Sequence, residues 1–159
     1  MPFVSTFIAK SQELKELDSK YPAPVRPVGK DFYTFPVNAD DLSDSEMEDW
    51  LVYFGAWRGY MGYLISKVES ELYILSEGFD VLLSTKVAVL EANAGKKFLK
   101  DSLKGQALSE DLQLQELKLK IIDSNGELKL LKGRLSLYDS GFETISRVVT
   151  RRGQDRFKI

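Results

Sequence analysis

The distribution of apolar and polar residues divides the chain at about residue 42. All five prolines lie before this point, at Pro2, Pro22, Pro24, Pro27 and Pro36. Beyond it, apolar residues recur every three or four positions over two long stretches, which is the spacing of an amphipathic helix. We therefore predict an N-terminal arm at residues 1–42 and a helical domain at residues 43–159.

The first long helix is predicted at about residues 43–92. Ser43 is followed three residues later by Glu46, which is the pattern of a capping box at a helix N-terminus. The apolar positions that follow form a heptad-like stripe, with one stutter between Val68 and Leu72 that locally unwinds a supercoil. The stripe consists of Met47, Trp50, Phe54, Trp57, Met61, Leu64, Val68, Leu72, Leu75, Phe79 and Leu82.

Glycines and aromatic residues share the first half of this helix. Each glycine inside a helix costs about 1 kcal/mol relative to alanine. We therefore expect Gly55, Gly59 and Gly62 to permit close approach of another helix. The aromatic residues are of the kind that stacks on nucleobases, but at helical spacing we interpret them as core. They are Trp50, Tyr53, Phe54, Trp57, Tyr60 and Tyr63.

The second long helix is predicted at about residues 109–152, with Ser109 as its cap. Its apolar stripe alternates steps of three and four from Leu114 to Val149 without a fault. The pair Asn125-Gly126 ordinarily indicates a turn. Because the heptad phase is unchanged across this pair, we predict that the helix continues through it. The stripe consists of Leu114, Leu117, Ile121, Ser124, Leu128, Leu131, Leu135, Tyr138, Phe142, Ile145 and Val149.

The connection between the two helices is short relative to their length. Residues 93–108 form a lysine-rich connector, with a short helix expected at 96–104. Two long helices joined in this way pack antiparallel. The predicted fold is all-α: a long antiparallel, coiled-coil-like helical hairpin with an extended proline-rich arm, in which a short helix at about residues 5–19 precedes the prolines. Whether the arm packs on its own chain or on a neighbour stays open.

A second apolar edge on the last helix predicts self-association. Apolar residues also lie outside the stripe that is predicted to face the first long helix. Together with the stripe they form a wide apolar face, and such a face usually packs against more than one partner. We therefore expect a homo-oligomer, with the arm helping to hold neighbours together. The second edge consists of Leu112, Leu119, Ile122, Leu130, Leu137 and Val148.

Composition argues against an enzyme. The chain contains no histidine and no cysteine, so it lacks the commonest general base and the usual zinc ligands. It also lacks a phosphate-binding or dinucleotide-binding glycine motif. We expect a non-enzymatic protein without metal or cofactor. Because no long uninterrupted apolar window occurs, we expect no membrane partner and a cytoplasmic location, the host cytoplasm if the protein is viral.

The charges are unevenly distributed, although the net charge is only −2. Residues 38–80 carry a net charge of −8, whereas residues 86–104 and 142–159 each carry +3. Clusters of lysine and arginine can bind a phosphate backbone without sequence preference. Alternatively, they form a solubilising connector and a C-terminal turn that favours the helix dipole. The candidate nucleic-acid-binding residues are Lys86, Lys96, Lys97, Lys100, Lys104, Arg147, Arg151, Arg152 and Arg156.

The acidic run between Asp40 and Asp49 has two interpretations. Carboxylates at this density can hold a divalent cation. Acidic residues in the first turn of a helix also interact favourably with the positive end of its dipole. We favour the second interpretation, because the run leads directly into the predicted capping box.

The C-terminal segment resembles a known family. The stretch 135–147, LSLYDSGFETISR, with its continuation at 148–152, VVTRR, resembles the end of phage recombination mediators of the UvsY type. Lys86-Val87-Ala88 echoes a Lys-Val-Ala of the same family. The resemblance implies an oligomeric protein that binds single-stranded DNA and loads a RecA-like recombinase. It makes Lys86, Arg147 and the pair at 151–152 candidates for phosphate contacts.

Two functions therefore stand side by side. One is a non-enzymatic, oligomeric accessory protein for single-stranded DNA of the recombination-mediator kind, with a recombinase as a further partner. The alternative is a phage structural or adaptor protein that forms a homo-oligomer through coiled-coil and arm contacts. The sequence does not fix the number of subunits or the identity of the partner protein.

Overall fold

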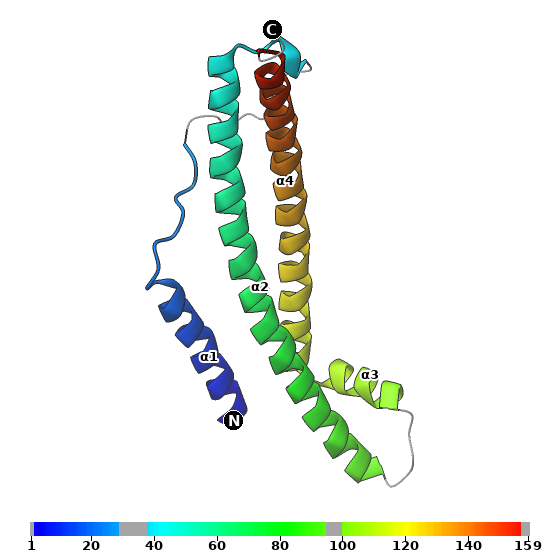
Figure 1. Ribbon diagram of the computed structural model, residues 1–159. Helices are drawn as coiled ribbons and strands as arrows, with labels where there is room; N and C mark the ends of the chain where they lie inside the picture. The colour runs from blue at the N-terminus through cyan, green and yellow to red at the C-terminus, as the bar shows by residue number, and fades with distance from the viewer. Residues whose placement is uncertain (1, 29–37, 95–99, 157–159) are drawn as a thin grey trace. The chain divides into compact units, whose positions relative to one another are not determined.

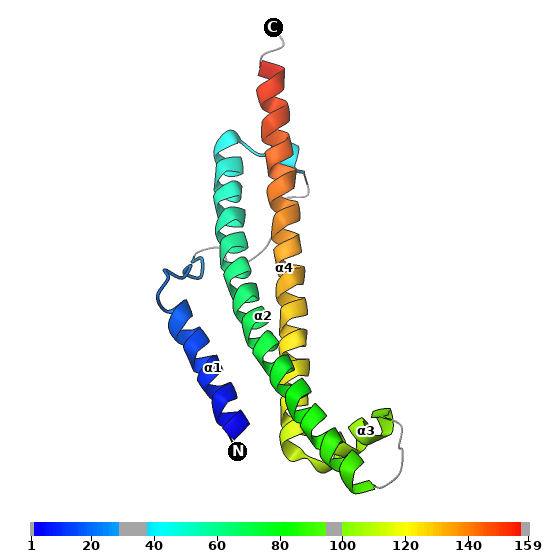
Figure 2. The same ribbon diagram turned by 60° about the horizontal axis from the view of Figure 1, so that its bottom comes forward.

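The computed structural model shows an all-α protein (Figures 1 and 2). It describes residues 2–28, 38–94 and 100–156. These ranges contain four α-helices and a short 3₁₀ helix, and they contain no β-strand. No helix in these ranges is long and apolar enough to cross a membrane. The helices are α1 (Pro2–Asp18), α2 (Asp44–Ala94), α3 (Lys100–Glu110) and α4 (Leu112–Arg156), and the 3₁₀ helix is Ala39–Asp41.

The capping box predicted at the start of α2 is confirmed. The carboxylate of Glu46 accepts hydrogen bonds from the backbone N–H and the hydroxyl of Ser43, at 2.8 and 2.7 Å. In return, the Ser43 hydroxyl accepts from the backbone N–H of Glu46 at 3.3 Å. These contacts satisfy N–H groups that have no partner inside the helix, which fixes the point where α2 begins.

The start of α4 differs from the prediction. Its cap is Asp111 rather than Ser109: the Asp111 carboxylate accepts from the backbone N–H groups of Gln113 and Leu114, at 2.9 and 3.2 Å. Ser109 instead belongs to the last turn of α3 and donates its hydroxyl to the carbonyl of Gln106. A carboxylate also suits the positive end of the helix dipole better than a hydroxyl does. The connector predicted at residues 93–108 therefore contains most of α3.

The chain forms two compact units, and α2 and α4 each contribute to both. The first unit comprises Met1–Tyr21 and Lys67–Leu128, and the second comprises Pro22–Ser66 and Lys129–Ile159. α4 is continuous through Asn125 and Gly126, as predicted, and the Asn125 side chain donates to the carbonyl of Ile121 at 2.9 Å.

The core of the second unit lies between the first turns of α2 and the last turns of α4. Met47 and Phe54 pack with Ile145 and Val148, and all four side chains are buried. Trp57 stacks on Tyr138, with ring centroids 5.6 Å apart. These contacts confirm that aromatic residues of the first stripe form core in this unit.

The core of the first unit combines three helices. Phe79 of α2 packs with Ala107 of α3 and with Leu114 and Ile121 of α4. Both views show α3 beside the last turns of α2 (Figures 1 and 2). α3 thus covers apolar surface that a two-helix arrangement would leave open.

The buried positions depart from the predicted stripes in two places. Val148 is buried while Val149 is 41% exposed, although the heptad phase selects Val149. Ile65 is also buried beside the predicted Leu64. An α-helix of 3.6 residues per turn drifts by about 20° per heptad, so the packed face moves to neighbouring positions along a long helix.

The described part of the chain places no other helix close to Gly55, Gly59 and Gly62, contrary to the prediction. A Cβ atom built on any of these three glycines meets no described atom within 4 Å. Close approach occurs instead at Gly141 of α4, over which the ring of Phe54 lies: an added Cβ would stand 2.7 Å from Cε1 and 2.8 Å from Cε2 of that ring. The large ring reaches its full burial because residue 141 carries no side chain.

We expect Gly141→Ala to destabilise the protein by about 1–3 kcal/mol, because the buried ring must shift to admit a methyl group. Gly55→Ala is the matched control, since its methyl group enters open space and removes the entropic cost of a helical glycine, for a gain of about 0.5–1 kcal/mol. Urea unfolding followed by circular dichroism measures both values. Equal effects of the two substitutions would contradict the packing of Phe54 on Gly141.

Candidate functional site

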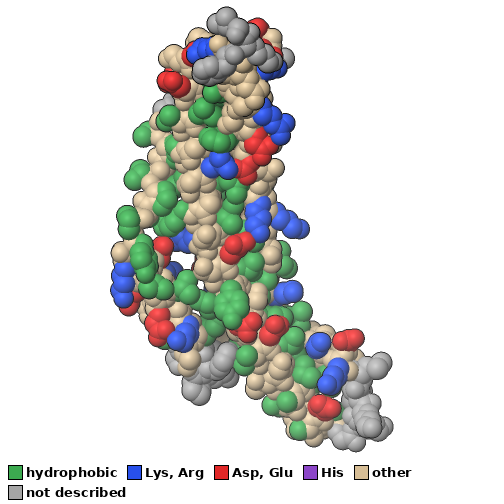
Figure 3. Space-filling view, in the orientation of Figure 1, with side chains coloured by type: hydrophobic (Ala, Val, Ile, Leu, Met, Phe, Trp, Pro, Cys, Tyr) green, Lys and Arg blue, Asp and Glu red, His purple; other side chains and the backbone are tan. Residues whose placement is uncertain are grey.

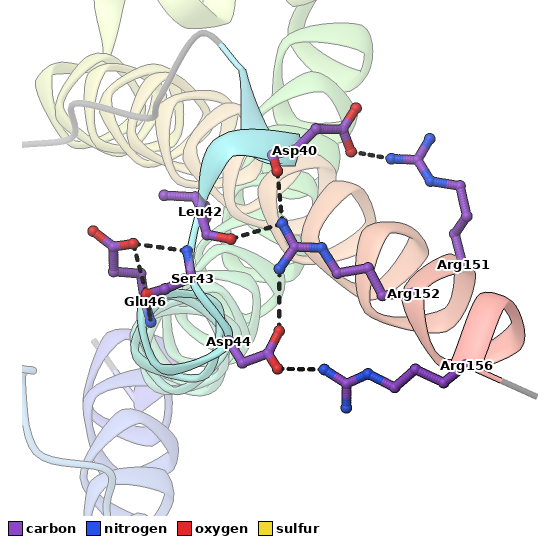
Figure 4. A network of polar contacts seen from close by, with 8 residues as sticks. All are labelled: Asp40, Leu42, Ser43, Asp44, Glu46, Arg151, Arg152 and Arg156. Carbon is purple, nitrogen blue, oxygen red and sulfur yellow. Dashed lines mark hydrogen bonds and ion pairs between the residues drawn. The ribbon is translucent and has the colours of Figure 1, made fainter.

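The C-terminal arginines lie against the acidic residues that precede and begin α2. Arg152 pairs with Asp44 at 3.1 Å, and Arg156 pairs with the other oxygen of the same carboxylate at 2.6 Å (Figure 4). Arg151 pairs with Asp40. The sequence places these arginines in a segment of net positive charge, and the fold of the second unit gives each of them an acidic partner.

Arg152 makes the most extensive contacts of this group. Besides its ion pair with Asp44, its guanidinium donates to the backbone carbonyls of Asp40 and Leu42, at 2.6 and 2.7 Å. The planar guanidinium has several donors in fixed directions, so it can bind a carboxylate and two carbonyls at once. Figure 4 shows the side chain reaching from α4 to the 3₁₀ helix and to the first turn of α2. Arg152 therefore ties the end of α4 to the segment that leads into α2.

These contacts change the acidity of Asp44. Hydrogen bonds from Arg156 and Arg152 stabilise the ionised carboxylate and lower the pKa of Asp44 below its ordinary value. The same principle applies at Glu46, whose pKa is lowered by hydrogen bonds from the N–H and hydroxyl of Ser43. The acidic run thus caps α2 and also binds arginines from α4. No group of three or more acidic side chains suited to a metal ion occurs among the described residues.

Much of the arginine surface remains accessible to solvent. The side chains of Arg151 and Arg156 are 59% and 69% exposed, while that of Arg152 is 30% exposed. Arg147 is 82% exposed and pairs with Glu143 one turn earlier, at 3.4 Å. Exposed pairs of this kind contribute little to stability, and a competing anion can replace the carboxylate.

The candidate lysines belong to the first unit and have different surroundings. Lys86 pairs with Asp111 at 2.8 Å, and this contact together with the capped N–H groups lowers the pKa of Asp111. Lys104 lies 3.7 Å from Asp101, one turn earlier in α3. Lys100 is exposed at the start of α3. Lys96 and Lys97 lie outside the described residues.

The acidic partners Asp40, Asp44 and Asp111 were not among the candidate site residues. A signal for the first two is present in the sequence, because the acidic run precedes the first long helix and the arginines end the second. In an antiparallel pair those two ends meet. The contact between Asp111 and Lys86 was harder to predict, because nothing in the sequence around either residue indicates that the two lie close together.

The comparisons with known proteins give no relative from which to transfer a function. No family model, no curated protein and no solved structure matches the chain. The resemblance to recombination mediators therefore stays a prediction.

We expect Arg152→Ala to lower the free energy of unfolding by about 1–2 kcal/mol, because two backbone carbonyls lose a charged donor in a partly exposed setting. Arg147→Ala removes only an exposed pair within α4, and its effect should lie within about 0.5 kcal/mol of zero. Urea titrations of both variants make the comparison. A larger loss for Arg147→Ala would refute the role assigned to Arg152.

The lowered pKa of Asp44 predicts a dependence of stability on pH. Since the pKa is lower in the folded chain, the contribution of Asp44 is present above the unfolded pKa of about 3.9 and disappears as the pH falls through the folded value. Asp44→Asn should therefore lower the melting temperature at pH 7, and the difference from wild type should shrink towards pH 2.5. Asp80→Asn, on an exposed part of α2, serves as the control. A difference that stays constant with pH would argue against the arginine pairs.

Proposed function

We propose that the chain is a non-enzymatic, self-assembling structural or adaptor protein, and that exposed apolar side chains on α4 form its contact with a second copy. In the first unit, Leu112, Leu119 and Ile122 are 73%, 61% and 54% exposed. In the second unit, Leu130 and Leu137 are 73% and 46% exposed. Exposed leucines in this number on one helix mark an interaction surface rather than ordinary surface variation.

The spacing of these residues supports a helix as the occupant. Leu112 and Leu119 in the first unit are seven residues apart, as are Leu130 and Leu137 in the second. Seven residues are about two turns of an α-helix, so the two members of each pair recur at nearly the same angle. Gly126 and Gly133 fall at intermediate positions of the same pattern, and an added Cβ on either one meets nothing within 4 Å. A second helix can approach closely at such positions. Because a second copy carries the same exposed leucines, it offers a matching apolar surface.

In the proposed assembly, each copy has the predicted helical hairpin. In the second unit, Asp44 meets Arg156 while Arg58 meets Asp139 at 2.5 Å, so the two helical segments run antiparallel there. In the first unit, Phe79 lies beneath Lys118 while Lys86 meets Asp111, which gives the same direction. We propose that these antiparallel segments belong to the predicted helical hairpin, with one side of α4 left for the second copy.

The proposal predicts an oligomer that depends on the exposed leucines. Light scattering after size-exclusion chromatography should give a mass that is a multiple of 18.0 kDa. Leu119→Lys and Leu130→Lys should each shift the protein towards the monomer without unfolding it, since both side chains are largely exposed. Gln113→Lys adds the same charge to an exposed position of α4 and should leave the mass unchanged. A monomeric wild-type protein at high concentration would refute the proposal.

Binding of single-stranded DNA is the second candidate, and the exposure of the C-terminal arginines is the observation that favours it. Phosphate oxygens and carboxylate oxygens make the same bidentate contacts with guanidinium groups. A nucleic-acid backbone could therefore take the place of Asp40 and Asp44 at Arg151 and Arg156. On this hypothesis, the protein would bind single-stranded DNA without sequence preference. A RecA-like recombinase would then bind the complex of protein and DNA.

Fluorescence anisotropy with oligo-dT at several salt concentrations tests this candidate. Binding should weaken as salt rises, because each phosphate contact releases counterions. Asp44→Asn should raise the affinity, since it removes the carboxylate that competes for Arg152 and Arg156, whereas Asp80→Asn should not. If wild type and Asp44→Asn both fail to bind at low salt, the DNA hypothesis is rejected.

A further inference from the structure

A second close approach, within the first unit, involves α1. The ring of Phe7 lies over Gly78 in the middle of α2, where an added Cβ would stand 2.7 Å from Cδ2 and 2.9 Å from Cζ of the ring. Gly78 and the adjoining Phe79 are both buried. A glycine inside a helix is unfavourable, and here it leaves a notch that admits an aromatic ring.

Phe7 is the least exposed of the apolar side chains of α1 whose burial the structure describes. Of these, Phe7 is partly buried, whereas Leu14 and Leu17 remain 38% and 51% exposed. Both leucines line a groove of about 520 Å³ beside α2, together with the exposed Tyr73 and Val81. Figure 3 shows hydrophobic side chains at the surface around α1. Apolar side chains of both helices, Leu14 and Leu17 of α1 and Tyr73 and Val81 of α2, are therefore exposed along this groove.

The chain between α1 and α2 is long. Residues 19–43 separate the two helices, and 25 residues reach at most about 80–90 Å when fully extended. Pro22, Pro24 and Pro27 favour extended backbone around them, and Val25 and Val28 are 84% and 97% exposed. The covalent connection therefore does not restrict α1 to the notch of its own chain.

We propose that the Gly78 notch is a docking site for Phe7 of a second copy of this chain, so that copies exchange α1. The proposal rests on the self-assembly proposed above. An exchanged helix makes the same contacts on a neighbour as on its own chain, so exchange needs no new surface. Once copies are held together, a neighbouring notch is present at millimolar effective concentration and competes with the chain's own.

The recognition chemistry explains why the docking is selective. A flat aromatic ring fits over the bare backbone of a glycine, while the methyl group of an alanine occupies the same space. The exposed leucines of α1 and the apolar residues of α2 then add unspecific contact area. Phe7 and Gly78 thus act as a knob and its hole, and both occur in every copy.

Cysteine cross-linking tests the exchange, because the natural chain contains no cysteine. Lys10 and Glu77 both line the groove, one on each helix. Copies with Lys10→Cys alone are unfolded and refolded together with ¹⁵N-labelled copies that carry Glu77→Cys alone. A short bismaleimide then joins the thiols, and mass spectrometry counts peptides that link positions 10 and 77. Such a link can form only between different chains. Glu48→Cys, exposed on α2 outside the groove, replaces Glu77→Cys as the control.

We expect the link between positions 10 and 77 to form in the mixture. Gly78→Ala should lower its yield by about 5- to 100-fold, because the ring no longer fits the notch. Gly59→Ala, which adds a methyl group in open space on the same helix, should leave the yield unchanged. If Gly78→Ala does not fold, Phe7→Ala supplies the same comparison from the other side of the contact.

Two other outcomes are decisive. In the first, the link between positions 10 and 77 fails to form in the mixture while the wild-type mass remains that of an oligomer. Exchange of α1 is then refuted, and the proposed self-assembly stands. If the wild-type protein is a monomer, both the exchange and the proposed self-assembly are refuted.

Discussion

A pair of α-helices can bury only one stripe along each partner, because the helix surface curves away from the contact. This constraint governs the protein, since α2 and α4 contain 51 and 45 residues and supply both cores. In the first unit, α3 adds Ala107 to the packed side chains, and α1 places Phe7 over Gly78. Leu112, Leu119 and Ile122 of α4 remain exposed in this unit. The helices within the described residues are too few to cover them.

The charged residues act at the places where the helices begin and end. Asp44 lies in the first turn of α2 and binds Arg152 and Arg156 from the last turns of α4. Acids at helix N-termini and bases at C-termini each complement the helix dipole, and antiparallel pairing brings them together. Asp111 repeats the arrangement in the first unit, where one carboxylate caps α4 and binds Lys86. The charge asymmetry of the sequence therefore has a structural use, whatever partner the protein binds.

This use affects the two functional hypotheses differently. The proposed self-assembly relies on leucines that are already exposed, so it requires no rearrangement. Binding of DNA through the C-terminal arginines requires phosphate to compete with Asp40 and Asp44. Such competition is compatible with the exposure of Arg151 and Arg156, but it costs Arg152 its bonds to two backbone carbonyls if that residue joins in. The geometry for these reasons favours the proposed assembly over the proposed binding of DNA by the last turns of α4.

Local patterns in the sequence determined the all-α class, the capping box at Ser43 and the passage of α4 through Asn125-Gly126, because helix periodicity and capping depend on neighbours within a few residues. The same patterns could not select which glycine lies beneath a ring. Gly55 and Gly141 look alike in sequence, and only the position of Phe54 across the interface distinguishes them. The cap at Asp111, the burial of Val148 and the acidic partners of the C-terminal arginines were likewise decided by tertiary contacts. Each of these features depends on which residues from distant parts of the chain come into contact. An α-helix has 3.6 residues per turn rather than the 3.5 of a heptad, so over many turns the residues that face the partner helix change.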